Sequence, residues 1–184
     1  TLYALGQLSH RHGLFICIGN HDEIDNRPEF VREVRRRFPL LLNQHRVLEI
    51  GGERITIGGL DYASSDGPSN RRAGHVANAA AVLSGYNSRR DGPMIAISHH
   101  PHVFDVLAPQ GVPLTLAGHT HGGQLMLSRP DERPDIGIGR LLFRYIRGFY
   151  HQGDATLFVN RGVGNWFPLR INAPAEVVQI QLTA

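Results

Sequence analysis

Lysine is absent from this chain of 184 residues, and all 19 of its basic residues are arginine. We interpret this bias as a property of the source rather than of a site. The 16 acidic residues leave a net charge of +3, and no basic block with interleaved aromatic residues indicates a nucleic-acid surface. The arginine-rich stretch 31–38, VREVRRRF, has its apolar residues on one helical stripe, so we expect its arginines on the solvent-exposed face of a helix.

Cysteine and long hydrophobic runs are also scarce. The single cysteine, Cys17, excludes a disulfide framework and, inside the apolar run LFICIG, favours a small buried hydrophobe. No apolar stretch approaches the length of a membrane span, and no secretory signal peptide is present. Because the chain starts at Thr1 without an initiator methionine, we expect a fragment, and these absences describe only the residues at hand.

The length and composition are typical of one globular domain over residues 1–184, with 41% hydrophobic residues. Helical patterns cover residues 1–13, 28–38, 75–86 and 103–110. Buried strands are predicted at 14–18, 93–98 and 112–117, later strands at 124–128, 156–160 and 177–182, and a hairpin around Gly51 and Gly52. Helices that alternate with buried strands indicate a layered α/β fold with a mixed sheet.

Three of the buried strands run into polar stretches: GNHDE at 19–23, SHHPH at 98–102 and GHTHGG at 118–123. Ligands of open α/β sheets bind outside the carboxyl ends of the strands, so parallel neighbours would bring these stretches to one rim. Six of the chain's 11 histidines lie in them, which favours a shared site over coincidence. The residues expected at this rim are Asn20, His21, Asp22, His99, His100, His102, His119 and His121.

The third stretch places His119 and His121 on either side of Thr120, with glycines around them. If the segment is extended, Thr120 points one way and both imidazoles point the other. Neutral imidazole is a common metal ligand, whereas an isolated pair of turn histidines more often caps a backbone carbonyl. The two other polar stretches favour the metal site.

Imidazoles combined with an amide or carboxylate oxygen form a mixed nitrogen and oxygen donor set. Such a set suits Mn, Fe, Co or Zn better than Ca or Mg. No thiolate takes part, which excludes a structural zinc site of the cysteine type. A sulfur-free site that opens at a loop rim is more typical of a catalytic metal than of a structural one.

Three motifs also carry a family resemblance. GNHD (19–22), the His99-His100-Pro101 triplet and GHTH (118–121) resemble, in order and strand-end placement, the later motifs of the calcineurin-like metallophosphoesterases. SHHPHVFD and the tail 157–182 are similar to a bacterial subgroup of that superfamily. The resemblance implies a layered α/β/β/α sandwich with mixed sheets that hydrolyses phosphomonoesters or phosphodiesters through a metal-activated hydroxide.

The resemblance also implies individual roles. Asn20, His99 and His119 would bind one divalent metal ion, and His121 would bind a second one. His21 would face the substrate phosphate and protonate the leaving oxygen. The family pattern begins with Asp-x-His and Gly-Asp strand ends that carry a bridging carboxylate. Nothing before residue 19 matches them, so we expect the N-terminal strands to be missing from this chain.

Several residues near the motifs have simpler interpretations. Asn20 could cap the helix that follows it, since asparagine is a good N-cap. We expect Asp22 to cap or to pair with an arginine, and Asp61 to be a turn residue. The stretch 60–70 could shape a substrate pocket. Structural or packing roles are expected for His100, His102, Arg161, Arg170, Trp166 and Phe167.

Two other function classes stay open at this point. One is a catalytically incomplete metal- or phosphate-binding module that retains half of a dinuclear site. The other is a different metallohydrolase, such as an amide hydrolase, which GNHD disfavours because a histidine beside a ligand asparagine fits phosphate protonation. For a phosphoesterase, the partner would be a phosphoester small molecule or a lipid head group, and no residue chooses between them.

Overall fold

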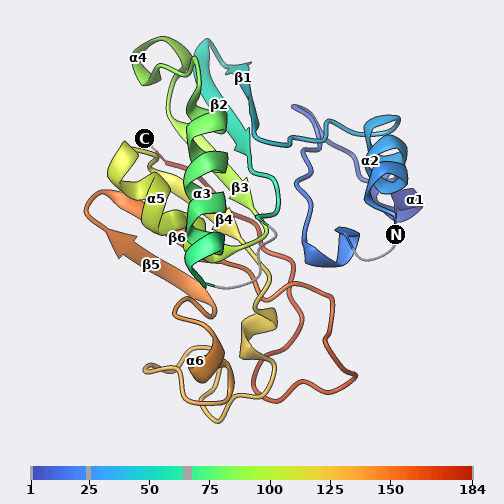
Figure 1. Cartoon of the computed structure of the whole chain (residues 1–184), viewed down its shortest axis with the longest axis vertical. Helices are drawn as coiled ribbons and strands as arrows, with labels where there is room; N and C mark the ends of the chain where they lie inside the picture. Colours follow the sequence, from blue (N-terminus) through green and yellow to red (C-terminus); the bar gives the residue numbers. More distant parts are fainter. Residues whose placement is uncertain (1, 24–25, 64–67, 184) are drawn as a thin grey trace.

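The computed structural model of the chain describes residues 2–23, 26–63 and 68–183. Its centre is a six-stranded sheet in the order β1-β2-β3-β4-β6-β5 (Figure 1). The strands are β1 (Gln44–Ile50), β2 (Glu53–Gly59), β3 (Met94–Ser98), β4 (Leu114–Ala117), β5 (Gly148–Gln152) and β6 (Ala155–Val159). The middle four strands run parallel, and β1 and β5 are antiparallel edges. The α/β fold with a mixed sheet is therefore confirmed.

Helices α3 (Pro68–Leu83) and α5 (Phe104–Leu107) cover one face of the sheet (Figure 1). α3 begins seven residues before the predicted start at 75, and α4 (Ser88–Asp91) follows it. The apolar core between helices and sheet consists of buried side chains from both layers: Leu60, Ala79, Val82, Met94, Ala96, Val103, Leu107 and Val112. This core fixes the loops that follow β3 and β4.

Helix α2 (Arg27–Arg35) matches the prediction for residues 28–38. The Asn26 side chain caps it by accepting the Glu29 N–H at 3.2 Å, and proline occupies the first turn. Val34 is buried in a small cluster with Ile18 and Phe38, while Arg32 and Arg35 of the helix are exposed. The arginine-rich stretch is thus the solvated face of a helix, as its periodicity indicated.

The N-terminal predictions are only partly met. The helix expected over residues 1–13 is limited to α1 (Leu2–Leu5). The segment 14–18 lies outside the six-stranded sheet and makes one parallel bridge, between Ile16 and Leu40. Its backbone pairs with residues 39–41, where Leu41 N–H donates to Ile16 O at 2.9 Å. Burial of this apolar run is therefore achieved by packing on the segment after α2 rather than by a ladder.

Two later predictions are corrected as well. Residues 124–128 form two isolated bridges instead of a strand, and 177–182 are irregular, because a strand requires a partner edge that hydrophobic pattern alone does not supply. The helix predicted over 103–110 is confirmed: α5 lies between two 3-10 turns, Pro101–Val103 and Ala108–Gln110. β5, which the sequence did not indicate, pairs with β6.

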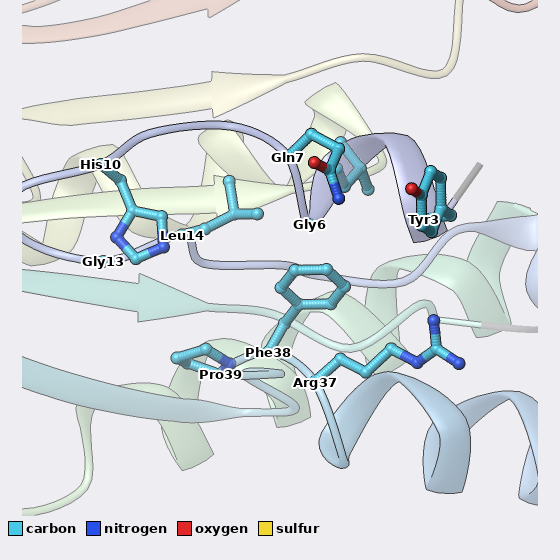
Figure 2. Close-up of a pocket in the computed structure, with 10 residues that line it drawn as sticks. Tyr3, Gly6, Gln7, His10, Gly13, Leu14, Arg37, Phe38 and Pro39 are labelled. Carbon is cyan, nitrogen blue, oxygen red and sulfur yellow. The ribbon is translucent and has the colours of Figure 1, made fainter.

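Two further features concern surfaces away from the sheet. In the described part of the chain, no helix has the length and apolar character needed to cross a bilayer. A cavity of about 490 Å³ lies between the first 14 residues and the end of α2, with Phe38 at its centre (Figure 2). None of the predicted ligands lines this cavity.

Candidate metal centre

The carboxyl ends of β3 and β4 lie next to each other, with Ser98 opposite Ala117 in the parallel register. A backbone hydrogen bond connects the first residues of the two loops that follow these strands: Gly118 N–H donates to His99 O at 3.1 Å. The GNHDE segment, folded as a 3-10 helix (Asn20–Glu23), reaches the same edge. The structure thus brings together the three polar stretches that the sequence placed on one rim.

Three predicted donor atoms meet at this edge. Asn20 Oδ1 lies 2.7 Å from His99 Nε2, and His99 Nε2 lies 3.0 Å from His119 Nδ1. Metal ligands of this type lie ~2.0–2.2 Å from the ion, so donor atoms that share an ion must themselves lie within ~3–4 Å of one another. Both contacts meet that requirement. The three side chains fit one divalent ion, which would take the place of the proton that His99 Nε2 donates to Asn20 Oδ1.

The protonation states of these histidines also fit metal binding. Burial, followed by the charges of His121 and His21, lowers the pKa of His99 to about 4. Burial, followed by the charge of His99, lowers the pKa of His119 to about 3. Both imidazoles are therefore neutral near pH 7, the form in which a ring nitrogen offers its lone pair.

His121 has its own support. Its Nδ1 lies 2.7 Å from the carbonyl oxygen of Gly164, which can only accept, so Nδ1 carries the proton. The lone pair is then on Nε2, and a backbone carbonyl that fixes the tautomer in this way is typical of metal-binding histidines. His121 follows His119 by two residues in the same loop after β4, so it belongs to the same edge of the sheet.

His21 is exposed and follows Asn20 directly in the 3-10 helix. Because it neighbours Asn20 in the chain, His21 lies at the same edge of the sheet. Asp22 caps this turn, as expected, by accepting the Gly19 N–H at 2.8 Å. A Cβ atom at Gly19 would lie 2.6 Å from His99 Nδ1, so the approach of the two segments requires glycine there.

The GHTH loop differs from the extended segment that we predicted. His119 and His121 have left-handed backbone, with φ of +73° and +51°, and Thr120 between them is helical. Thr120 is fully buried, and its hydroxyl donates to Ile146 O at 2.5 Å. This buried hydrogen bond turns the chain tightly at Thr120. Non-glycine residues with such backbone are uncommon and concentrate at functional sites.

Known proteins with similar sequences are named as metallophosphoesterases or as a phosphodiesterase. The chain is 30% identical over 183 residues to an uncharacterized metallophosphoesterase of Campylobacter jejuni, covering 97% of this chain and 44% of that protein. It is 24% identical to the uncharacterized metallophosphoesterase YkoQ of Bacillus subtilis, covering 98% of this chain and 64% of YkoQ. It is 27% identical to the phosphodiesterase YaeI of Escherichia coli, covering 91% and 57%.

The chain belongs to the calcineurin-like metallophosphoesterase superfamily. No protein-family model and no solved structure matches it. The chain spans about half the length of the curated relatives it matches, between 44% and 64% for the three named above.

The simpler interpretations can now be weighed for this metallophosphoesterase chain. The Asn20 side chain contacts His99, so its oxygen is directed at the predicted ligands. Asp61 pairs with Arg27 at 2.5 Å, which is more than a turn role. Of the stretch 60–70, residues 64–67 lie outside the described residues. The Tyr62 ring lies 6.1 Å from the His99 ring, so this end of the stretch does border the candidate site.

Both arginines of the C-terminal segment have structural contacts. Arg170 donates to five backbone carbonyls, including that of His121 at 3.2 Å and that of Ala173 at 2.8 Å. Arg161 forms an ion pair with Glu176. These contacts hold the segment that supplies Gly164 to His121, in agreement with the structural role that we expected.

Gln124 supports the site in a way that the sequence did not indicate. Its buried Nε2 donates to Phe167 O at 2.6 Å and to Leu169 O at 2.9 Å. Its Oε1 accepts the Trp166 N–H at 2.9 Å, which holds the indole 5.3 Å from the His121 ring. In the sequence, a glutamine after a glycine pair is equally typical of an exposed loop and of a buried supporting residue. Only the structure therefore reveals the role of Gln124.

Within the described ranges, no group of three or more His, Cys, Asp or Glu side chains is placed to hold a metal ion. The converging set consists of two imidazoles and the amide of Asn20, with His121 nearby. The candidate centre therefore depends on an amide oxygen, a donor without charge.

Proposed function

We propose that this chain carries part of the active site of a metal-dependent hydrolase that acts on phosphomonoesters or phosphodiesters. The observation that carries the proposal is the position of His99 Nε2, which lies 2.7 Å from Asn20 Oδ1 and 3.0 Å from His119 Nδ1. The donor types suit Mn, Fe, Co or Zn. The proposal includes a second ion in the complete site, held on this chain by His121.

The side chains divide the chemical tasks among themselves. Bound divalent ions would supply Lewis-acid activation of water at neutral pH and charge compensation for the phosphate. Asn20 contributes an oxygen without adding negative charge that would repel the substrate. His21, exposed at the same edge, would donate a proton to the leaving oxygen, because an imidazole can act as a general acid.

The substrate is proposed only as a class. A phosphoester small molecule and a phosphoester lipid head group both present the anionic phosphate that metal ions at the candidate centre would bind. The names of the relatives, metallophosphoesterase and phosphodiesterase, support this class and go no further.

One observation favours a second candidate function. Because the described residues contain no complete group of three His, Cys, Asp or Glu ligands, the chain could be a metal- or phosphate-binding module without turnover. Metal stoichiometry separates the two, since an active dinuclear enzyme needs two ions per protein and a remnant holds one or none.

The test uses His99→Ala and His119→Ala in the protein that carries this chain, with His12→Ala as the control, because His12 is exposed and outside the site. We expect both site variants to lose hydrolysis of bis(4-nitrophenyl) phosphate and to hold less metal by elemental analysis, whereas His12→Ala should match the wild type. Unchanged metal content in both site variants would refute the ligand assignment. Metal binding without wild-type hydrolysis would favour the binding module.

A further inference from the structure

A basic cleft lies beside the candidate metal centre. Residues from the start of α3, from α5, from α6 (Gly139–Leu142) and from β5 line it. It consists of an inner cavity of about 200 Å³ and an outer one of about 560 Å³, which share Arg72 and Asp105. We define the basic cleft by the cationic and imidazole side chains that line these cavities: Arg71, Arg72, His75, His102, Arg140, Arg144 and His151.

The charge of the cleft is positive. Its four arginines face a single carboxylate, that of Asp105, among the lining residues. Asp105 Oδ1 already accepts from the Tyr145 hydroxyl at 2.7 Å and from Arg144 at 3.2 Å, so this carboxylate is engaged. Arg71 and Arg72 are then the cations of the inner cavity that an incoming anion would meet.

Unpaired imidazole nitrogens point to a ligand at the inner cavity. Among the described residues, the buried Nε2 atoms of His75 and His100 and the buried Nδ1 of His102 have no hydrogen-bond partner. His75 and His100 are only 5% and 3% exposed. Buried polar atoms in folded proteins are nearly always paired. Two of these residues, His75 and His102, line the inner cavity, so a ligand in this cavity could pair with their free nitrogens.

The donors around the inner cavity define what that ligand must be. The guanidinium groups of Arg71 and Arg72 only donate, so they call for a ligand rich in acceptor oxygens. His100 does not line the cavity, but its ring lies 5.1 Å from that of His75 and 4.9 Å from that of His102, which do. Its Nδ1 accepts the His102 backbone N–H at 3.4 Å, so the proton of the neutral His100 ring lies on Nε2.

The cleft adjoins the metal centre directly. The His100 ring lies 4.7 Å from the His119 ring and 5.1 Å from the His75 ring, so one row of imidazoles links a predicted metal ligand to the cavity.

We propose that the basic cleft binds a second phosphate group of the substrate, distinct from the phosphate that is hydrolysed at the metal centre. This inference rests on the proposed function and extends it to a substrate with at least two phosphates. Arginine pairs bind phosphate oxygens in a bidentate manner. The inner cavity, at about 200 Å³, is smaller than the ~300–1,000 Å³ of pockets for drug-sized ligands and suits a single tetrahedral anion with its waters.

The test compares two substrates with the same leaving group: thymidine 5′-(4-nitrophenyl phosphate) and its analogue with an added 3′-phosphate. We expect the wild type to show a higher kcat/KM for the analogue by about tenfold or more, the size expected for a charge-assisted contact. Arg71→Gln should abolish this preference. Arg89→Gln is the matched control, because Arg89 is exposed on α4, away from the cleft, and it should keep the wild-type preference.

A binding measurement separates this inference from the proposed function. Calorimetry with inorganic phosphate should give one binding site fewer in Arg71→Gln than in the wild type and in Arg89→Gln. If the wild type hydrolyses neither substrate but Arg71→Gln loses a phosphate site, the proposed function fails and the anion site stands. Equal substrate preference and equal phosphate binding in all three proteins would refute the proposal that the basic cleft binds a second phosphate group. Arg72→Gln replaces Arg71→Gln if the latter does not fold.

Discussion

At the level of single residues, exposure separates the histidines of the candidate site into two kinds. His99 and His119 are buried enough that their pKa values fall to about 4 and about 3, which favours lone-pair donation. His21 is exposed beside them and remains accessible to a substrate in solution. A ligand must stay unprotonated, whereas a general acid must carry and release a proton, so these environments suit different tasks.

We therefore expect His21→Ala to keep its metal and to hydrolyse alkyl phosphoesters roughly 10²–10⁴-fold more slowly, the usual contribution of a general acid. Esters of 4-nitrophenol, whose leaving group needs little protonation, should lose much less. The measurement is kcat for both ester types together with metal per chain. Equal losses for the two types would show that His21 only positions the phosphate.

At the level of elements, the short α4 turn depends on one carboxylate. Asp91 accepts from Arg90 Nε at 2.7 Å and from Asn87 N–H at 2.9 Å, and these two contacts, the Arg90 one first, lower its pKa to about 2. The Thr56 hydroxyl of β2 donates to Asp91 O at 2.8 Å, which ties the turn to the sheet. The turn thus sets where β3 starts.

Asp91 should make stability depend on pH in a defined window. Because its pKa in the folded state is below the ordinary value of 3.8, its contribution is complete above about pH 4 and is lost as the pH falls toward about 2. Asp91→Asn should lower the urea midpoint at pH 6, and the gap from the wild type should narrow as the pH falls through this window. A gap that stays constant from pH 6 to pH 3 would contradict the ionic contribution.

The sequence predicts elements where burial alone decides them. β3 and β4 match because apolar runs of this length are buried in any arrangement, and α2 matches because its periodicity and cap are local. Residues 14–18 and 177–182 have equally good strand patterns but no ladder, because pairing depends on distant segments.

Four predicted ligands are found at one edge, as their motifs indicated. Gln124 and the basic cleft could not be predicted, since their roles arise from contacts between segments far apart in sequence.

For the whole molecule, the sheet is the frame that holds the candidate site. β4 pairs with β3 on one side and β6 on the other, so the GHTH loop is supported by the central strands. Leu157 of β6 is fully buried in a second core with Phe104 and Val159. This core lies in the body of the fold, whereas the ligands lie at the strand ends.

Leu157→Ala should lower the free energy of unfolding by ~2–5 kcal/mol, as is usual when a large apolar side chain is removed from a core. Metal content under native conditions should stay at the wild-type value, because the ligands are at the edge of the sheet. Chemical denaturation and elemental analysis measure the two quantities. Leu141→Ala, at an 86% exposed position of α6, is the control and should change stability by less than ~0.5 kcal/mol. A comparable loss in both variants would contradict the described core.

The left-handed backbone at His119 and His121 sets stability against function in this loop. A residue with a Cβ atom pays ~1–2 kcal/mol for that conformation, and glycine would relieve it. A search for more thermostable variants would therefore tend to replace the two histidines, and the gain in heat resistance would come with the loss of both predicted ligands. Directed evolution of this protein needs a selection for turnover at every round, because selection for folding alone favours an inert scaffold.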